Sequence, residues 1–213
     1  MTLFGAGSYI LAGMEKPSLP LRARKKDATR RALLVAAHRR FHATGFEATT
    51  IDQVAADIGI SRRTFFRYFP DKESLAFPHR HERLARFVEL LGSSPAGETP
   101  FASLRRIARI FAKEYMQNRD SLVAQQNLVE ATPALQAREA EIDRDWEAGM
   151  ARAFGERYGT GHEAELRARV LAGAAIGVIR ATMRYWFATG GKADLAWLGD
   201  EALDRLERGF KVE

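Results

Sequence analysis

Residues 49–69 read TTIDQVAADIGISRRTFFRYF. Thr50 is a typical helix N-cap residue, and Gln53 follows three positions later, as a capping box requires. Ser61 is a second N-cap residue, and Gly59 just before it supplies the backbone freedom of a tight turn. Two short helices joined by a turn that contains glycine form a helix-turn-helix unit. The stretch therefore predicts such a unit.

The second of these two helices carries a cluster of basic side chains. Ala55 on the first helix is small, which allows the two helices to cross closely, and the pattern points Arg62, Arg63 and Arg67 outward. An arginine fork binds guanine in the major groove through two hydrogen bonds, while hydroxyls, ammonium groups and helix N-termini bind phosphates. This combination favours a DNA-reading helix over the alternative of an ordinary helical corner with solvated arginines.

The charge along the chain is uneven. Residues 1–72 hold 13 Lys and Arg against 6 Asp and Glu, a net charge of +7, whereas the remainder holds 20 against 21. Such an asymmetry indicates a polyanion as the partner of the first third of the chain. Within it, residues 22–26 (RARKK) suggest either a basic arm that reaches a neighbouring minor groove or a flexible solubilising tail.

The chain resembles the tetracycline-repressor (TetR) family of bacterial transcription regulators over residues 28–75. The resemblance rests on residues that occur in that family's order: Gly45, Phe46, Thr49, Thr50, Ala55, Gly59, Ser61, Thr64, Phe69 and Lys72. It implies that the helix after Ser61 reads an operator and that Thr50, Tyr68 and Lys72 hold phosphates. One departure is Phe66, where family members usually carry a tyrosine, so a phosphate-binding hydroxyl is missing there.

We therefore expect DNA contacts from a set of residues on and around the second helix of the unit. These are Thr50, Ser61, Arg62, Arg63, Thr64, Phe66, Arg67, Tyr68 and Lys72.

The rest of the sequence predicts an all-α protein of about nine helices. Apolar residues recur at helical spacing, no stretch alternates over strand length, and residues 92–100 (GSSPAGETP) predict a linker. The expected helices cover about residues 27–44, 50–58, 62–69, 71–91, 101–115, 119–131, 133–154, 163–189 and 194–210, with Pro78 expected to kink the fourth. The expected domains are a flexible leader and basic arm (1–26), a helix-turn-helix head (27–72) and a regulatory and dimerisation domain (73–213).

Two features are expected in the C-terminal domain. Helix 163–189 is apolar almost all round between Val170 and Ile179, and this predicts a homodimer through the last two helices. Aromatic and methionine stripes predict an apolar effector cavity or, as the commoner alternative, plain core. Its expected residues are Phe111, Tyr115, Trp146, Met150, Phe154, Arg180, Met183 and Trp186, with Gln126 and Asn127 as weaker polar candidates.

Several function classes are disfavoured by the sequence. It has no cysteine, no phosphate-binding or dinucleotide-binding glycine motif and no nucleophile elbow, so we expect neither an enzyme nor a cofactor. His38 and His42 lie four residues apart without a third ligand, so no metal site is expected. The first thirteen residues lack a secretory signal and no apolar run spans a bilayer, so a cytoplasmic location is expected.

Together these features predict a sequence-specific transcriptional regulator, most simply a ligand-responsive repressor that binds a palindromic operator as a dimer. One alternative is a DNA-binding architectural protein without ligand control. An enzyme with an unrecognised site is the weaker alternative.

Overall fold

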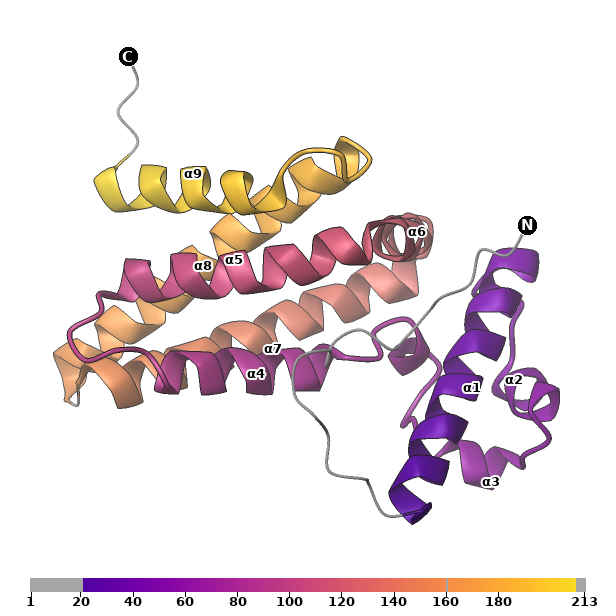
Figure 1. Ribbon diagram of the computed structural model, residues 1–213. Helices are drawn as coiled ribbons and strands as arrows, with labels where there is room; N and C mark the ends of the chain where they lie inside the picture. Colours follow the sequence, from indigo (N-terminus) through magenta and orange to yellow (C-terminus); the bar gives the residue numbers. More distant parts are fainter. Residues whose placement is uncertain (1–20, 160, 210–213) are drawn as a thin grey trace. The chain divides into compact units, whose positions relative to one another are not determined.

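The computed structural model describes residues 21–159 and 161–209, and these ranges contain nine α-helices and no β-strand (Figure 1). The all-α prediction is therefore confirmed. The helices are α1 (Leu21–Thr44), α2 (Ile51–Asp57), α3 (Arg62–Phe65), α4 (Arg80–Gly92), α5 (Pro100–Gln117), α6 (Arg119–Glu130), α7 (Pro133–Tyr158), α8 (His162–Ala188) and α9 (Leu195–Arg208), with a 3₁₀ turn at Glu73–Leu75.

Capping side chains set several of the helix starts that the sequence predicts. The backbone N–H of Gln53 donates to Thr50 Oγ1 at 3.2 Å, and the N–H of Thr50 donates to Gln53 Oε1 at 2.9 Å, which completes the capping box of α2. Ser61 Oγ accepts from the N–H of Thr64 at 3.1 Å at the start of α3. Asp194 caps α9 in the same way.

The expected start of the first helix at Asp27 is wrong, because α1 begins six residues earlier at Leu21. Residues 22–26 are good helix formers, and no glycine or proline interrupts them. Asp27 instead forms an ion pair with Arg31 one turn later, at 3.2 Å. The basic stretch is thus helical, while residues 1–20 of the expected leader and arm (1–26) lie outside the described residues.

The expected helix over residues 71–91 is also wrong. The chain forms the short 3₁₀ turn and then α4, and Pro78 lies between them. Proline has no N–H to donate and disfavours the helical conformation in the residue before it, so it separates two elements here and does not kink one. Asp71 caps the 3₁₀ turn by accepting from the N–H of Ser74 at 2.7 Å. Conversely, Gly155 does not interrupt α7, which continues to Tyr158.

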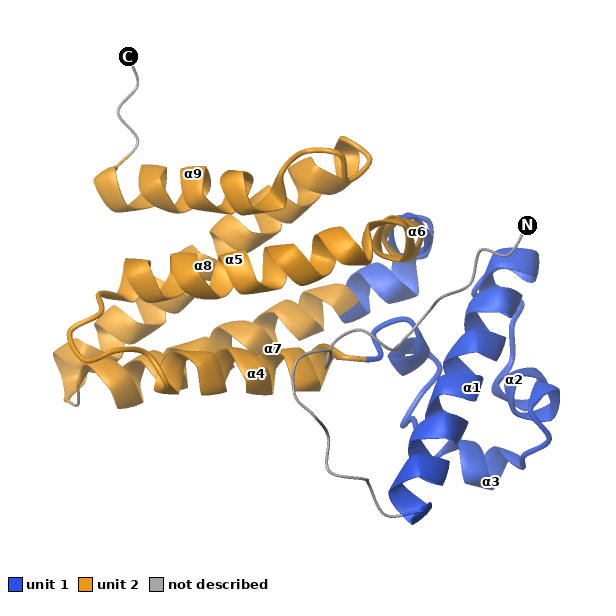
Figure 2. Ribbon diagram, viewed as in Figure 1, with its two compact units in different colours: residues 1–78, 127–138 blue, residues 79–126, 139–213 orange. Residues whose placement is uncertain are grey.

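Contacts divide the chain into two compact units, which are described separately (Figure 2). Unit 1 comprises residues 1–78 and 127–138, and unit 2 comprises residues 79–126 and 139–213. The C-terminal turn of α6 and the first turns of α7 therefore belong to the same unit as the N-terminal helices.

Unit 1 has a small core in which α1 packs against α2 and the 3₁₀ turn, and α2 packs against α3. In unit 2, α5 packs against α4 and α9, and α9 also packs against α8. The largest cluster of unit 2 joins residues of α4, α5, α7, α8 and α9, and its side chains include Phe87, Leu104, Ile107, Met150, Phe154, Ile176 and Leu203.

A half-buried polar network ties the loop between α4 and α5 to α5. Arg106 donates to both carboxylate oxygens of Glu98 at 3.1 Å, and Ser103 Oγ donates to Glu98 Oε2 at 2.7 Å. These hydrogen bonds lower the pKa of Glu98 from 4.5 to about 2, with that from Arg106 as the largest cause. The segment predicted as a linker is therefore tied to α5.

Candidate nucleic-acid interface and cavity

Helices α2 and α3 meet at the turn that the sequence predicts. Gly59 lies in this turn with φ of 70°, a conformation that favours glycine, and the N–H of Ile60 closes the turn on the carbonyl of Ala55 at 3.0 Å. Ala55 is buried, and Val54 and Phe65 beside it have no exposed surface. The local sequence thus holds α3 against α2 through a tight turn and a compact apolar contact.

The outward side of α3 and of the turn after it is basic. Arg62, Arg63 and Arg67 are exposed, and Phe66 is 45% exposed beside them. Arg62 Nη1 lies 3.0 Å from Asp52 Oδ2, and the guanidinium lies 5.5 Å from the centre of the Phe66 ring. Asp52 and Phe66 therefore orient Arg62, whereas Arg63 and Arg67 form no ion pair with any described residue.

Lys72 forms hydrogen bonds within the helix-turn-helix head. Its Nζ donates to the carbonyl oxygens of Phe46 at 2.9 Å and Thr49 at 3.1 Å, and it lies 4.1 Å from the centre of the Phe46 ring. Two of the three ammonium donors thus hold the loop that precedes α2. The sequence contained no signal for this contact, because 23 or more residues separate Lys72 from both carbonyls.

Arg39 and Arg40 of α1 form a clamp on Asp57 at the end of α2. Arg40 binds Asp57 with two hydrogen bonds of 2.7 and 2.6 Å, and Arg39 donates to the same carboxylate at 3.0 Å. The Arg40 hydrogen bonds are the main reason that the pKa of Asp57 falls to about 2. Sequence reasoning missed this clamp, which also occupies two of the basic residues of the head.

The histidines of α1 differ in their surroundings. His38 is half-buried, and desolvation lowers its pKa, while His42 is exposed. Within the described residues, no three His, Cys, Asp or Glu side chains lie close enough together to hold a metal ion. None of the described helices has the length and apolar character that a bilayer crossing requires.

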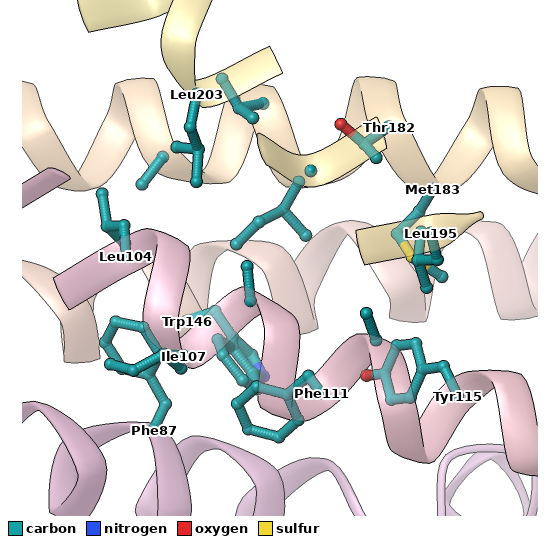
Figure 3. Close-up of a pocket in the computed structure, with 16 residues that line it drawn as sticks. Phe87, Leu104, Ile107, Phe111, Tyr115, Trp146, Thr182, Met183, Leu195 and Leu203 are labelled. Atoms are coloured by element: carbon teal, nitrogen blue, oxygen red, sulfur yellow. The ribbon is translucent and has the colours of Figure 1, made fainter. Parts of the chain in front are cut away.

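Unit 2 contains an apolar cavity of about 120 Å³ (Figure 3). Tyr115 and Thr182 supply the only hydroxyl groups of its lining, and no charged side chain lines it. Arg83 Nη1 donates to Tyr115 Oη from outside the lining, at 3.3 Å. The walls come from α4, α5, α7, α8 and α9, and their labelled side chains are Phe87, Leu104, Ile107, Phe111, Tyr115, Trp146, Thr182, Met183, Leu195 and Leu203.

Only part of the expected effector set lines this cavity. Phe111, Tyr115, Trp146 and Met183 do so. The others lie elsewhere within the described residues: Met150 and Phe154 are wholly buried core, Trp186 is buried in a second cluster, and Arg180 is exposed, while Gln126 and Asn127 also lie outside the lining.

Contacts with other residues explain why Trp186 and Arg180 lie outside the cavity. Trp186 Nε1 donates to the carbonyl of Ala193 at 3.0 Å, so its ring fills the turn before α9. Arg180 on α8 is exposed, and its Nη1 lies 3.7 Å from Oδ2 of Asp143 on α7. The sequence does not predict the walls contributed by α9, because an apolar stripe on this helix suits an interface between subunits as well as a cavity wall.

Helix α8 presents an uncovered stripe in unit 2. Leu166, Val170 and Tyr185 are 57%, 63% and 58% exposed, and they share one side of the helix with the small residues Ala174 and Gly177. On α9, Leu195 and Leu203 face the core and Trp197 is 61% exposed. The two helices therefore leave apolar surface open after the core of unit 2 is complete.

Two family models match the chain. Residues 33–77 match the model of bacterial regulatory proteins of the tetR family, and residues 98–211, more than half of the chain, match the model of the MftR C-terminal domain. The chain belongs to the TetR family. It is a TetR-family transcriptional regulator with an N-terminal helix-turn-helix and a C-terminal helical domain.

Relatives of this TetR-family protein cover most of its length. It is 31% identical over 173 residues to the HTH-type transcriptional regulator TcmR of Streptomyces glaucescens, a match that covers 78% of this chain and 76% of TcmR. The crystal structure of Thermus thermophilus FadR, a TetR-family repressor in complex with lauroyl-CoA, is 25% identical with a TM-score of 0.55, over 86% of this chain and 96% of FadR. The SmeT–triclosan complex is 24% identical with a TM-score of 0.53, over 83% and 88% of the two chains.

Proposed function

We propose that this TetR-family regulator is a ligand-responsive repressor that binds a palindromic operator as a homodimer and releases it when an apolar effector enters unit 2. The observation that carries the proposal is the cavity lined by five helices of unit 2. FadR, which is 25% identical, is a repressor whose structure contains lauroyl-CoA. An effector acts by binding one conformer of the repressor more tightly than another.

The DNA contacts fall into two classes. Arg62 and Arg63 stand at the start of α3, where side chains reach base edges in the major groove, and they carry the discrimination between sequences. The residues around them position the protein on the sugar-phosphate backbone. This second class is Thr50, Ser61, Thr64, Phe66, Arg67, Tyr68 and Lys72.

The lining of the cavity defines the effector class. An ionised group inside it would lose its hydration without gaining a charged partner, so the part of the effector that enters is neutral and apolar. Pockets for drug-sized ligands measure about 300–1,000 Å³, and a dry cavity of about 150 Å³ holds benzene. At about 120 Å³ the cavity accepts a small ring as it stands, and a longer ligand displaces flexible side chains such as Met183.

The homodimer is proposed through α8 and α9. The stripe that contains Leu166, Val170 and Tyr185 is an apolar surface that a second copy covers, and Ala174 and Gly177 allow the two backbones to approach closely. A two-fold dimer carries its two α3 helices into successive major grooves, about 34 Å apart.

The test begins with selection of bound fragments from genomic DNA to obtain the operator. Indole and naphthalene, as small neutral probes, are then titrated while melting temperature and operator binding are followed. We expect both to raise the melting temperature and to release the DNA. Ala108 on α5 also lines the cavity. The variant Ala108→Leu places three extra carbons against the cavity, and it should bind the operator normally and lose the response to both probes.

Two results would contradict the proposal. If the Ala108→Leu variant responds to the probes as the unmodified protein does, the effector site lies elsewhere. If neither probe binds the unmodified protein, the cavity does not receive apolar ligands. General coverage of DNA in place of protected palindromes would support the architectural alternative.

A further inference from the structure

Most of the positive charge of unit 1 lies outside the part of the head that matches the family model. Residues 33–77 hold six Lys and Arg against five Asp and Glu, a net charge of +1. Residues 21–32 hold six against one, a net charge of +5. Neutralisation of DNA phosphates dominates the affinity of DNA-binding proteins. With a net charge of +1, residues 33–77 alone attract DNA only weakly.

Contacts within the head reduce its available charge further. Asp57 neutralises Arg39 and Arg40, Asp52 pairs with Arg62, and Lys72 donates to two backbone carbonyls. Among the six cations of residues 33–77, this leaves Arg63 and Arg67 without an ion pair in the described part of the chain.

The first turns of α1 differ in this respect. Arg22, Arg24, Lys25 and Lys26 are exposed, and none of them forms an ion pair within the described residues. In Figure 1, the first turn of α1 and helix α3 lie at the same end of unit 1. Arg30 connects the two regions, because its guanidinium lies 5.3 Å from the centre of the Phe69 ring, just after α3.

We propose that Arg22, Arg24, Lys25 and Lys26 form a phosphate-binding extension of α1 that supplies most of the electrostatic attraction of this protein for DNA. The helical conformation of these residues holds the four charges within little more than one turn of α1, on the same body as α3, in place of an extended arm in a minor groove. The extension rests on the DNA-binding role proposed above, and it contributes affinity without sequence discrimination because phosphates are the same at every base pair.

The test measures binding to a short duplex of scrambled sequence over a range of KCl concentrations. Each lost phosphate contact lowers the slope of log K against log salt by about 0.9, so Lys25→Gln/Lys26→Gln should lower it by about 1.8 per protomer. Binding at physiological salt should weaken roughly tenfold or more. Adding Arg22→Gln and Arg24→Gln should deepen both effects, while the ratio of operator to scrambled affinity stays unchanged.

The matched control is Lys113→Gln/Lys192→Gln, which removes the same charge from two exposed lysines of unit 2 and should leave the salt slope unchanged. Glutamine and lysine have similar helix propensities, and far-ultraviolet circular dichroism verifies that each variant is folded. The same slope in the α1 variant and the unmodified protein would overturn the extension while leaving the repressor function intact. A loss that appears only on the operator would also overturn it. If the unmodified protein binds no DNA, the proposed function itself fails.

Discussion

Arg138 on α7 donates a hydrogen bond to Asp71 in the segment after α3, with Nη2 3.2 Å from Oδ2. The same helix carries Trp146, which lines the cavity. We therefore expect a shift of α7 on effector binding to change the contact at Asp71. We expect Asp71→Asn to keep the cap on Ser74 through its remaining carbonyl oxygen, to lose the ion pair and to weaken effector-driven release of DNA severalfold.

The matched variant for this coupling is Arg138→Gln, which should reproduce the effect. The double variant should be no worse than either single variant, because both remove the same interaction. Effector affinity, measured by calorimetry without DNA, should be little changed. Full release of operator by effector in either single variant would show that the pair carries no coupling.

Arg62 and Arg63 should discriminate between DNA sequences. Each good bidentate contact to guanine is worth about 1–3 kcal/mol of discrimination, so each alanine variant should reduce the operator preference by about that amount. Asp52→Ala should produce a smaller loss, since it frees Arg62 from its 3.0 Å partner without removing the guanidinium. Titration against operator and scrambled duplexes measures these effects. If both arginine variants keep the full preference, α3 is not the reading helix.

Lys72 should contribute to the stability of the head in the absence of DNA. Lys72→Ala removes the donors to the carbonyls of Phe46 and Thr49, and we expect the free energy of unfolding to fall by about 1–3 kcal/mol. Denaturation of the free protein measures this, with Lys113→Ala on exposed α5 surface as the control. An unchanged stability together with a flatter salt dependence would assign Lys72 to phosphates alone.

Glu98 should make the protein sensitive to acid. Its pKa is about 2 in the folded protein against an ordinary value of 4.5, so the stabilisation is fully present above pH 4.5 and is lost as the pH falls towards 2. Glu98→Gln should be less stable at neutral pH and should lose less stability over that window. Urea denaturation at several pH values measures this. Glu89→Gln, exposed on α4, is the control and should follow the unmodified protein.

Val170 should be needed for the homodimer and not for the fold of the subunit. Since its side chain is 63% exposed, Val170→Asp should yield a folded monomer. Ala174→Lys, at a half-buried position of the same stripe, should also dissociate the dimer. Light scattering at micromolar concentration reports the mass. Val35→Asp, at an exposed valine of α1, should remain dimeric. A monomeric mass for the unmodified protein would refute the interface.

The helix-turn-helix could be predicted from the sequence because its determinants are local. The capping pair Thr50 and Gln53, the turn at Gly59 and the cap at Ser61 act within a few residues, and each appears where the sequence predicts it. By contrast, the contacts of Lys72 and the clamp on Asp57 join residues 17 or more positions apart. Periodicity carries no information on which distant groups meet.

The cavity could be predicted only in part for a related reason. The spacing of Phe111, Tyr115 and Trp146 shows that they share apolar faces, but not whether a face meets a void or a packed neighbour. Met150 and Phe154 lie on the same apolar side of α7 and meet packed core. The outcome depended on α9, whose apolar stripe suits a subunit interface as well as an interior wall.

The clamp of Arg39 and Arg40 on Asp57 has a consequence for the release of this regulator from DNA. With a pKa of about 2, Asp57 stays ionised at every pH that a living cell tolerates, so protonation never loosens α2 from α1. The hydrogen bonds of Arg39 and Arg40 to Asp57 therefore hold these two helices together over that whole pH range. For the proposed homodimer, we therefore expect an effector to change the distance and tilt between two intact heads and not to unfold them.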